Sequence, residues 1–243
     1  MKTLDEAKDH ALELMKSAGF PIKEEITIAV DEKLPFMGYT TQRNGKPLIV
    51  VSKWSLATDM SMGLIIHELG HVYMIELNHP SHNPYLHSKA TQNALQGKKI
   101  YPYQIQIIHN IINNIQDLYA DDISFPVYIN KSGKNDLSEF FLGWIRKPKS
   151  APFSREDAWK NTEMLLSAAF AKANLERHKT VDTNGKVKKA LEIFLSKVDP
   201  KLAKKFEYFK KLMVNLPKIT TDLKFEKLLE EYISEFLKLA EIT

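Results

Sequence analysis

Helical and strand-like patterns of apolar residues alternate along the first half of the chain. Residues 4–18 place apolar side chains three or four positions apart, and Gly19 and Pro21 are typical of a helix end. The pair Asn44-Gly45 is typical of a hairpin turn. β-branched and apolar runs predict strands at residues 25–30, 36–42 and 48–52. We therefore expect one helix followed by a small sheet that contains a hairpin.

Helical spacing dominates the rest of the chain. A long helix is predicted at 56–77, then a loop over 78–102 with one short helix at 88–95, and a second long, mostly apolar helix at 103–123. Residues 125–152 contain several Pro and Gly residues and are predicted to be irregular. Further helices are expected at 155–178, 186–198, 201–215 and 222–240.

This order of elements predicts an α+β fold with two parts. Residues 1–150 form a domain with a helix, a small twisted sheet and two long helices, and residues 151–243 form an all-helical subdomain. The last helix has an apolar face, which indicates packing within that subdomain and leaves a homodimer as the alternative. Its residues are Leu228, Leu229, Tyr232, Ile233, Phe236 and Leu237.

Composition restricts the chemistry. None of the 243 residues is Cys, so disulfides, thiol nucleophiles and Cys-held metals are excluded, and any metal must be bound by His, Asp or Glu. Six of the eight His residues lie between residues 67 and 109. Such a concentration of imidazole points to that stretch as the site of function.

Charge and hydropathy argue against several classes of partner. The net charge is +4, and from residue 179 onwards 14 Lys are interleaved with 10 acidic residues, which is too mild a surplus for nucleic-acid binding. No apolar stretch is long enough for a signal peptide or a membrane span. We expect a cytoplasmic protein without nucleic-acid or membrane partners.

The segment His67-Glu68-Leu69-Gly70-His71 matches the HExxH pattern inside a predicted helix. Two His residues four positions apart project from one helix face, so both imidazoles can bind one zinc ion. The Glu between them can take a proton from a water whose pKa the zinc lowers to about 7. This spacing predicts metal ligands at His67 and His71 and a general base at Glu68.

A catalytic zinc requires a third protein ligand. A third His six residues after His71 is excluded, because that position is Leu77. On the next long helix, Asn113, Asp117 and Asp121 share a face, and Asp117 is placed to be the third ligand. Asp121, one turn later, is placed to accept the outer N–H of a ligating His. The alternative is that both Asp residues cap a helix end, with Asp122, His109 or Glu139 as substitute ligands.

These motifs resemble the zincin metallopeptidases in their gluzincin arrangement, in which HExxH is followed on a later helix by Glu-x-x-x-Asp. The local likeness is to HtpX-type and CAAX-prenyl endopeptidases, whose second motif reads Glu-x-x-Ala-Asp, where this chain has Asp117-Leu118-Tyr119-Ala120-Asp121. The resemblance implies a zincin-like fold for residues 1–150, zinc on His67, His71 and Asp117, and Asp121 beside them. Because Asp117 stands where those families have Glu, its side chain is one methylene shorter. The helix that carries it must therefore lie closer to the HExxH helix. The membrane helices of those peptidases are missing from this sequence.

Other roles at the site stay open at the level of sequence. A donor for the developing oxyanion could come from Tyr119, Tyr128, His109 or His178. In zincins an edge strand binds extended substrate, and residues 48–52 are the counterpart here, although an ordinary core strand is an equal alternative. The remaining His residues between the two long helices are expected to be solvated loop residues, with a second metal or a substrate gate as the alternative. They are His79, His82 and His87.

The leading hypothesis is thus a zinc metallopeptidase that hydrolyses peptide or protein substrates. The alternative is a zinc-stabilised binding or regulatory protein, whose site is latent or non-catalytic and whose helical part recognises a partner.

Overall fold

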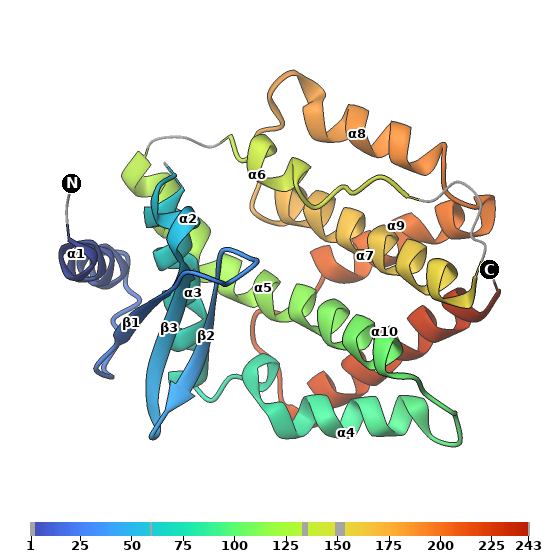
Figure 1. Ribbon diagram of the computed structural model, residues 1–243, viewed down its shortest axis with the longest axis horizontal. Helices are drawn as coiled ribbons and strands as arrows, with labels where there is room; N and C mark the ends of the chain where they lie inside the picture. The colour runs from blue at the N-terminus through green and yellow to red at the C-terminus, as the bar shows by residue number, and fades with distance from the viewer. Residues whose placement is uncertain (1–2, 59, 133–135, 149–153, 243) are drawn as a thin grey trace. The chain divides into compact units, whose positions relative to one another are not determined.

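The strands predicted after the first helix form a small mixed sheet. The computed structural model describes residues 3–58, 60–132, 136–148 and 154–242. In these ranges three strands pair in the order β1-β3-β2, with β1 parallel and β2 antiparallel to β3 (Figure 1). The strands are β1 (Thr27–Asp31), β2 (Gly38–Arg43) and β3 (Lys46–Ser52). Asn44 and Gly45 both have positive φ, 53° and 75°, as a type I′ turn requires, so the predicted hairpin is confirmed.

Of the two alternatives for residues 48–52, an edge strand that binds substrate and an ordinary core strand, the core strand is confirmed. These residues belong to β3, whose two edges are occupied by β1 and β2, and Ile49 and Val51 on β3 are fully buried. The open edges of the described sheet are those of β1 and β2. Its most apolar strand takes the centre because only there are both faces and both edges covered.

The helix predicted at 56–77 begins later than expected, at Ser61, and a separate short helix precedes it. A short α2 (Lys53–Leu56) is followed, after a turn, by α3 (Ser61–Glu76). Ser52 starts α2 because its hydroxyl accepts the backbone N–H of Ser55, at 3.3 Å. α3 is apolar on nearly all sides, which is typical of a helix at the centre of a core. It contacts β2 and also α1 (Leu4–Ser17), whose predicted range is confirmed to within one residue (Figure 1).

The segment between the two long helices is more ordered than the expected loop. A 3₁₀ turn, η1 (Pro80–His82), leads into α4 (Pro84–Leu95), which begins four residues before the predicted short helix. The Asn83 side chain caps this helix by accepting the backbone N–H of Tyr85, and Pro84 occupies the first turn, where its missing N–H has no consequence.

The second long helix is longer than predicted. α5 (Pro102–Ser132) continues past Pro126, so the prediction that residues 125–152 are irregular is wrong for the first part of that range. A proline inside a helix costs about 3 kcal/mol. Here Phe125 and Val127, on either side of it, are buried, and this packing offsets the loss.

Of the remaining helices, the last four lie where the apolar spacing predicts them, and the first lies within residues 125–152 and is a further correction to that predicted irregular segment. They are α6 (Ser138–Leu142), α7 (Arg155–Arg177), α8 (Lys186–Leu195), α9 (Pro200–Val214) and α10 (Asp222–Ile242), with a 3₁₀ turn η2 (Thr183–Gly185) before α8. The described chain is therefore α+β and mostly helical, as predicted. None of its described helices combines the length and apolar character needed to cross a bilayer.

Contacts divide the described chain into two compact units. Unit 1 comprises residues 1–82 and 119–134, and unit 2 comprises residues 83–118 and 135–243. The division crosses α5 between Leu118 and Tyr119. The predicted domain boundary at residue 150 falls outside the described residues and stays a prediction.

The apolar face of the last helix packs inside unit 2. α10 contacts α4 and α7, and five of the six apolar residues named for it are at most 1% exposed. They are Leu229, Tyr232, Ile233, Phe236 and Leu237. This supports the packed-subdomain interpretation of that face, whereas a homodimer would need another surface and remains a prediction.

Candidate metal centre

The two His residues of the HExxH segment converge on one point. His67 and His71 are one turn apart on α3, their Nε2 atoms are 3.1 Å apart, and their rings meet edge to face. When two nitrogens bind the same zinc ion at about 2.0–2.1 Å in a tetrahedral site, the two nitrogens are about 3.3 Å apart. The observed separation fits such a shared ion closely.

Asp117 completes a group of three. One ligand atom each from His67, His71 and Asp117 lies within 4.8 Å of the others, and all three residues are half-buried. Asp117 is on α5, one turn before Asp121 and two residues before the part of that helix that belongs to unit 1. Two imidazoles and one carboxylate form a donor set typical of catalytic zinc, so the residues present fit this metal.

Asp121 contacts the ring nitrogen of His67 that points away from His71 and the candidate metal position. Its Oδ1 is 2.9 Å from Nδ1 of His67, and the carboxylate is 1% exposed. Ser124 donates a further hydrogen bond to the same oxygen, at 3.4 Å. A carboxylate at Nδ1 keeps the proton there, which leaves the Nε2 lone pair for a metal. This is the position that the spacing of the two motifs predicted for Asp121.

The two motif helices come unusually close at small residues. A Cβ atom built on Gly70 would lie 2.7 Å from the backbone oxygen of Ala120, closer than real Cβ atoms approach. Only glycine at position 70 therefore allows this approach of α3 to α5. The sequence interpretation required closer helices if Asp replaces the longer Glu as a ligand, and the contact supplies that closeness.

Glu68 is buried beside the sheet. It is 3% exposed, and its Oε2 is 2.8 Å from the Thr40 hydroxyl on β2. That hydroxyl is also 3.1 Å from the backbone oxygen of Glu68, but the carboxylate is the stronger acceptor. Gly38, on the same face of β2, would place a Cβ 3.5 Å from Oε1, so β2 runs beside both oxygens of the carboxylate. Sequence reasoning missed Thr40, because nothing local to β2 indicates its neighbour on α3.

Sequence reasoning also missed a chain of polar groups that starts at Nδ1 of His71. Nδ1 of His71 is 2.7 Å from Nε2 of His82, and Ser81 Oγ lies between Nδ1 of His82, at 2.8 Å, and Nδ1 of His79, at 2.7 Å. Ser81 is fully buried, and His79 and His82 are partly buried. The expectation that these two His residues are solvated in a loop is wrong. The His-rich composition of the segment was the available signal.

The other candidates named from the sequence do not join this group. Among the described residues, no other cluster of three potential ligands includes Asp122, His109 or Glu139. Glu139 pairs with Lys186 in unit 2, and His109 is exposed two turns before Asp117 on α5. Asn113, on the same face of α5 as Asp117 and Asp121, is exposed.

Burial and position in the fold reduce the number of residues that could donate a hydrogen bond to the oxyanion. Tyr119 is fully buried, and its ring packs at a tilt against His79 with 4.6 Å between the ring centroids, so it faces the core instead of a substrate. The His178 Nδ1 lies 3.0 Å from the Asn174 carbonyl at the end of α7 in unit 2. Tyr128 is half-buried in unit 1 beside Gly63 and remains a candidate.

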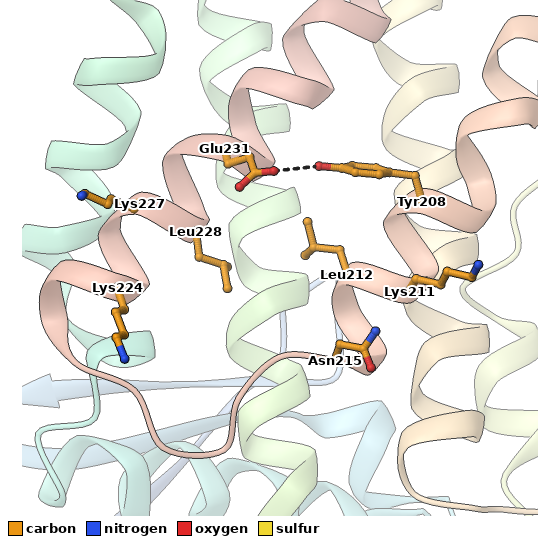
Figure 2. Close-up of a pocket in the computed structure, with 8 residues that line it drawn as sticks. All are labelled: Tyr208, Lys211, Leu212, Asn215, Lys224, Lys227, Leu228 and Glu231. Carbon is orange, nitrogen blue, oxygen red and sulfur yellow. Dashed lines mark hydrogen bonds between the residues drawn. The ribbon is translucent and has the colours of Figure 1, made fainter.

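A separate cleft in unit 2 lacks comparable chemistry. It encloses about 620 Å³ between α9 and α10 and is lined by Tyr208, Lys211, Leu212, Asn215, Lys224, Lys227, Leu228 and Glu231. Figure 2 shows the two leucines facing each other across the space and the lysine amines directed away from it. Burial, with the nearby charges of Glu231 and Glu235, raises the pKa of Tyr208 to about 12, and the phenol donates to Glu231 at 3.3 Å. The one carboxylate that lines the cleft, Glu231, is hydrogen-bonded to Tyr208, and among the described residues it belongs to no group of three potential metal ligands.

Comparison with known proteins gives a family without an assigned activity. No curated protein and no solved structure matches the chain. One family model, described as a family of unknown function (DUF5781), matches residues 10–238. Because this match covers nearly the whole sequence, the chain belongs to the DUF5781 family.

Proposed function

We propose that this protein is a zinc-dependent metallopeptidase with a zincin-like site. The observation that carries the proposal is the convergence of one ligand atom each from His67, His71 and Asp117 beside the buried Glu68 carboxylate. The donor set suits a hydrolytic zinc with one open position, and Asp121 behind His67 is the expected outer partner. These contacts support the zincin resemblance of the two motifs.

The chain's own groups divide the work of amide hydrolysis. When bound, zinc supplies a Lewis acid that polarises the scissile carbonyl and acidifies a water molecule. Glu68 accepts the proton of the attacking water and passes it to the leaving amine. Thr40 holds the Glu68 carboxylate in place, and Asp121 holds the His67 ring. Proton transfer then takes place between groups that are already oriented.

The open edge of β2 is suited to an extended peptide. β2 is an edge strand, and its Thr40 hydroxyl contacts the proposed general base directly. A peptide that pairs with an edge strand gains backbone hydrogen bonds regardless of its sequence. A substrate added at β2 would therefore run beside Glu68, which assigns to β2 the role that the sequence interpretation gave to residues 48–52.

The direct test compares wild type with Glu68→Gln. Both proteins are loaded with one equivalent of Zn²⁺ and incubated with an unstructured protein and with short peptides, and new amino termini are identified by mass spectrometry. Glu68→Gln should bind zinc like wild type and lose hydrolysis by about 10²–10⁴-fold, the usual contribution of a general base. Glu13→Gln, an exposed change on α1, is the charge-matched control and should keep full activity.

The outcomes separate the two functions. Unchanged hydrolysis in Glu68→Gln would refute the assigned base. Zinc binding without cleavage by wild type on any substrate would favour the alternative of a zinc-stabilised binding or regulatory protein, for which the low exposure of Glu68 is the supporting observation. Hydrolysis that requires both zinc and Glu68 would exclude that alternative.

A further inference from the structure

We propose that His82 is a positioning residue for the metal ligand His71, and that it acts through a chain of hydrogen bonds that ends at His79. The inference rests on the proposed metal centre and adds to it a residue that neither motif contains. Each ligating His normally donates its outer N–H to a fixed acceptor, which orients the ring and sets its tautomer. Asp121 does this for His67, and His82 occupies the equivalent place behind His71.

The direction of the hydrogen bond between His71 and His82 determines the direction of the other hydrogen bonds in the chain. If Nε2 of His71 binds a metal, the neutral ring carries its proton on Nδ1, which donates to Nε2 of His82 at 2.7 Å. His82 then carries its own proton on Nδ1 and donates to Ser81 Oγ, at 2.8 Å. The Ser81 hydroxyl in turn donates to Nδ1 of His79, at 2.7 Å. All three links can be satisfied at once with neutral rings.

The far end of the chain is fixed in the core. The backbone N–H of Ser81 also lies 3.2 Å from Nδ1 of His79, and Ser81 is fully buried. The His79 ring packs against Tyr119, which belongs to the same helix as Asp117 and Asp121. Backbone hydrogen bonds from His79 to Met74 and from His82 to His79 join this segment to the end of α3. The acceptor offered to His71 is therefore held by structure on both motif helices.

Two other His residues that follow the HExxH segment, His87 and His109, have different surroundings. His87 is placed on α4 in unit 2, where its ring lies 6.2 Å from that of Phe225. His109 is exposed on α5. Nε2 of His82 contacts Nδ1 of the His71 ring, and Nε2 of His67 lies against its Nε2.

The test measures metal affinity instead of catalysis. Wild type, His82→Ala, His82→Gln and the exposed control His109→Ala are titrated with Co²⁺ and with Zn²⁺ against a chromophoric chelator, and the Co²⁺ absorption spectrum is recorded. Loss of an outer partner typically lowers metal affinity by about 10–100-fold, which is the result expected for His82→Ala. His82→Gln should recover most of the affinity, because its amide oxygen can accept the His71 N–H. His109→Ala should match wild type.

The proposal fails if folded His82→Ala binds both metals as tightly as wild type, with the same Co²⁺ spectrum. It also fails if the Gln and Ala variants are equally weak, because the hydrogen bond would then not be the cause. Should His82→Ala not fold, Ser81→Ala tests the next link, and an affinity unchanged from wild type would contradict the chain. A wild type that binds no metal would instead overturn the proposed function itself.

Discussion

At the residue scale, the contact between Thr40 and Glu68 joins the sheet to the proposed chemistry. Removing the hydroxyl leaves the Glu68 carboxylate without the donor 2.8 Å away that fixes its orientation. We expect Thr40→Val to lower kcat by about tenfold, equivalent to about 1.4 kcal/mol, while zinc affinity stays unchanged. Steady-state kinetics on a zinc-loaded peptide assay would measure this effect.

A neighbouring residue supplies the control for that prediction. Thr41 is the next residue on β2 and projects from the opposite face of the sheet, so Thr41→Val introduces the same change away from Glu68. Its kcat should equal that of wild type. Equal losses in the two variants would show that the sheet, and not the hydrogen bond to Glu68, is responsible.

The sequence predicted the residues whose roles depend on local spacing. His67, Glu68 and His71 lie on one helix, and Asp117 and Asp121 lie one turn apart on another, so helical periodicity alone groups each set. Thr40 and His82 reach the site through tertiary contacts 28 and 11 residues away along the chain. No periodic pattern encodes such a contact, which explains why both were missed.

At the scale of elements, the approach of α3 to α5 depends on Gly70. In Gly70→Ala the new methyl would meet the Ala120 backbone oxygen, which no side-chain rotation can relieve. We expect the helices to separate, with a loss of about 1–3 kcal/mol in the free energy of unfolding and weaker zinc binding, because Asp117 is carried on α5. Chemical denaturation and a zinc titration would detect the two effects.

Gly63 on the same helix provides the matched control. A Cβ at this position meets only the Tyr128 ring, at 3.5 Å, which is an ordinary contact. Gly63→Ala should therefore be neutral or raise the unfolding free energy by up to about 1 kcal/mol, because glycine is unfavourable inside a helix. If both substitutions destabilise the protein equally, the close contact at Gly70 has no special role.

Element boundaries were predicted less well where tertiary packing or capping decides them. Asn83 and Pro84 lie in the predicted loop, yet together they start α4 as cap and first helical residue. The sequence predicts that this helix ends at residue 123, before Pro126, but the buried residues beside Pro126 keep α5 helical to Ser132. The central position of β3 also could not be predicted, because strand order depends on pairing between segments and not on the pattern within one.

At the scale of the whole molecule, metal binding should raise the free energy of unfolding. A ligand that binds only the folded state at 100 times its Kd adds about 2.7 kcal/mol to the free energy of unfolding. For a chain of this size that corresponds to a rise of about 5–10 °C in Tm, which differential scanning calorimetry would show on addition of Zn²⁺. His71→Ala should lose most of this rise. An identical rise in that variant would indicate metal binding elsewhere.

The central claim is that one zinc ion binds at His67, His71 and Asp117, and its most direct test is the zinc stoichiometry and affinity of wild type beside Asp117→Ala. Metal analysis by mass spectrometry, with competition against a chelator of known affinity, gives both quantities. We expect one tightly bound zinc per wild-type chain and binding weakened by at least about tenfold in the variant. Equal zinc binding by the two proteins, or none by wild type, would contradict it.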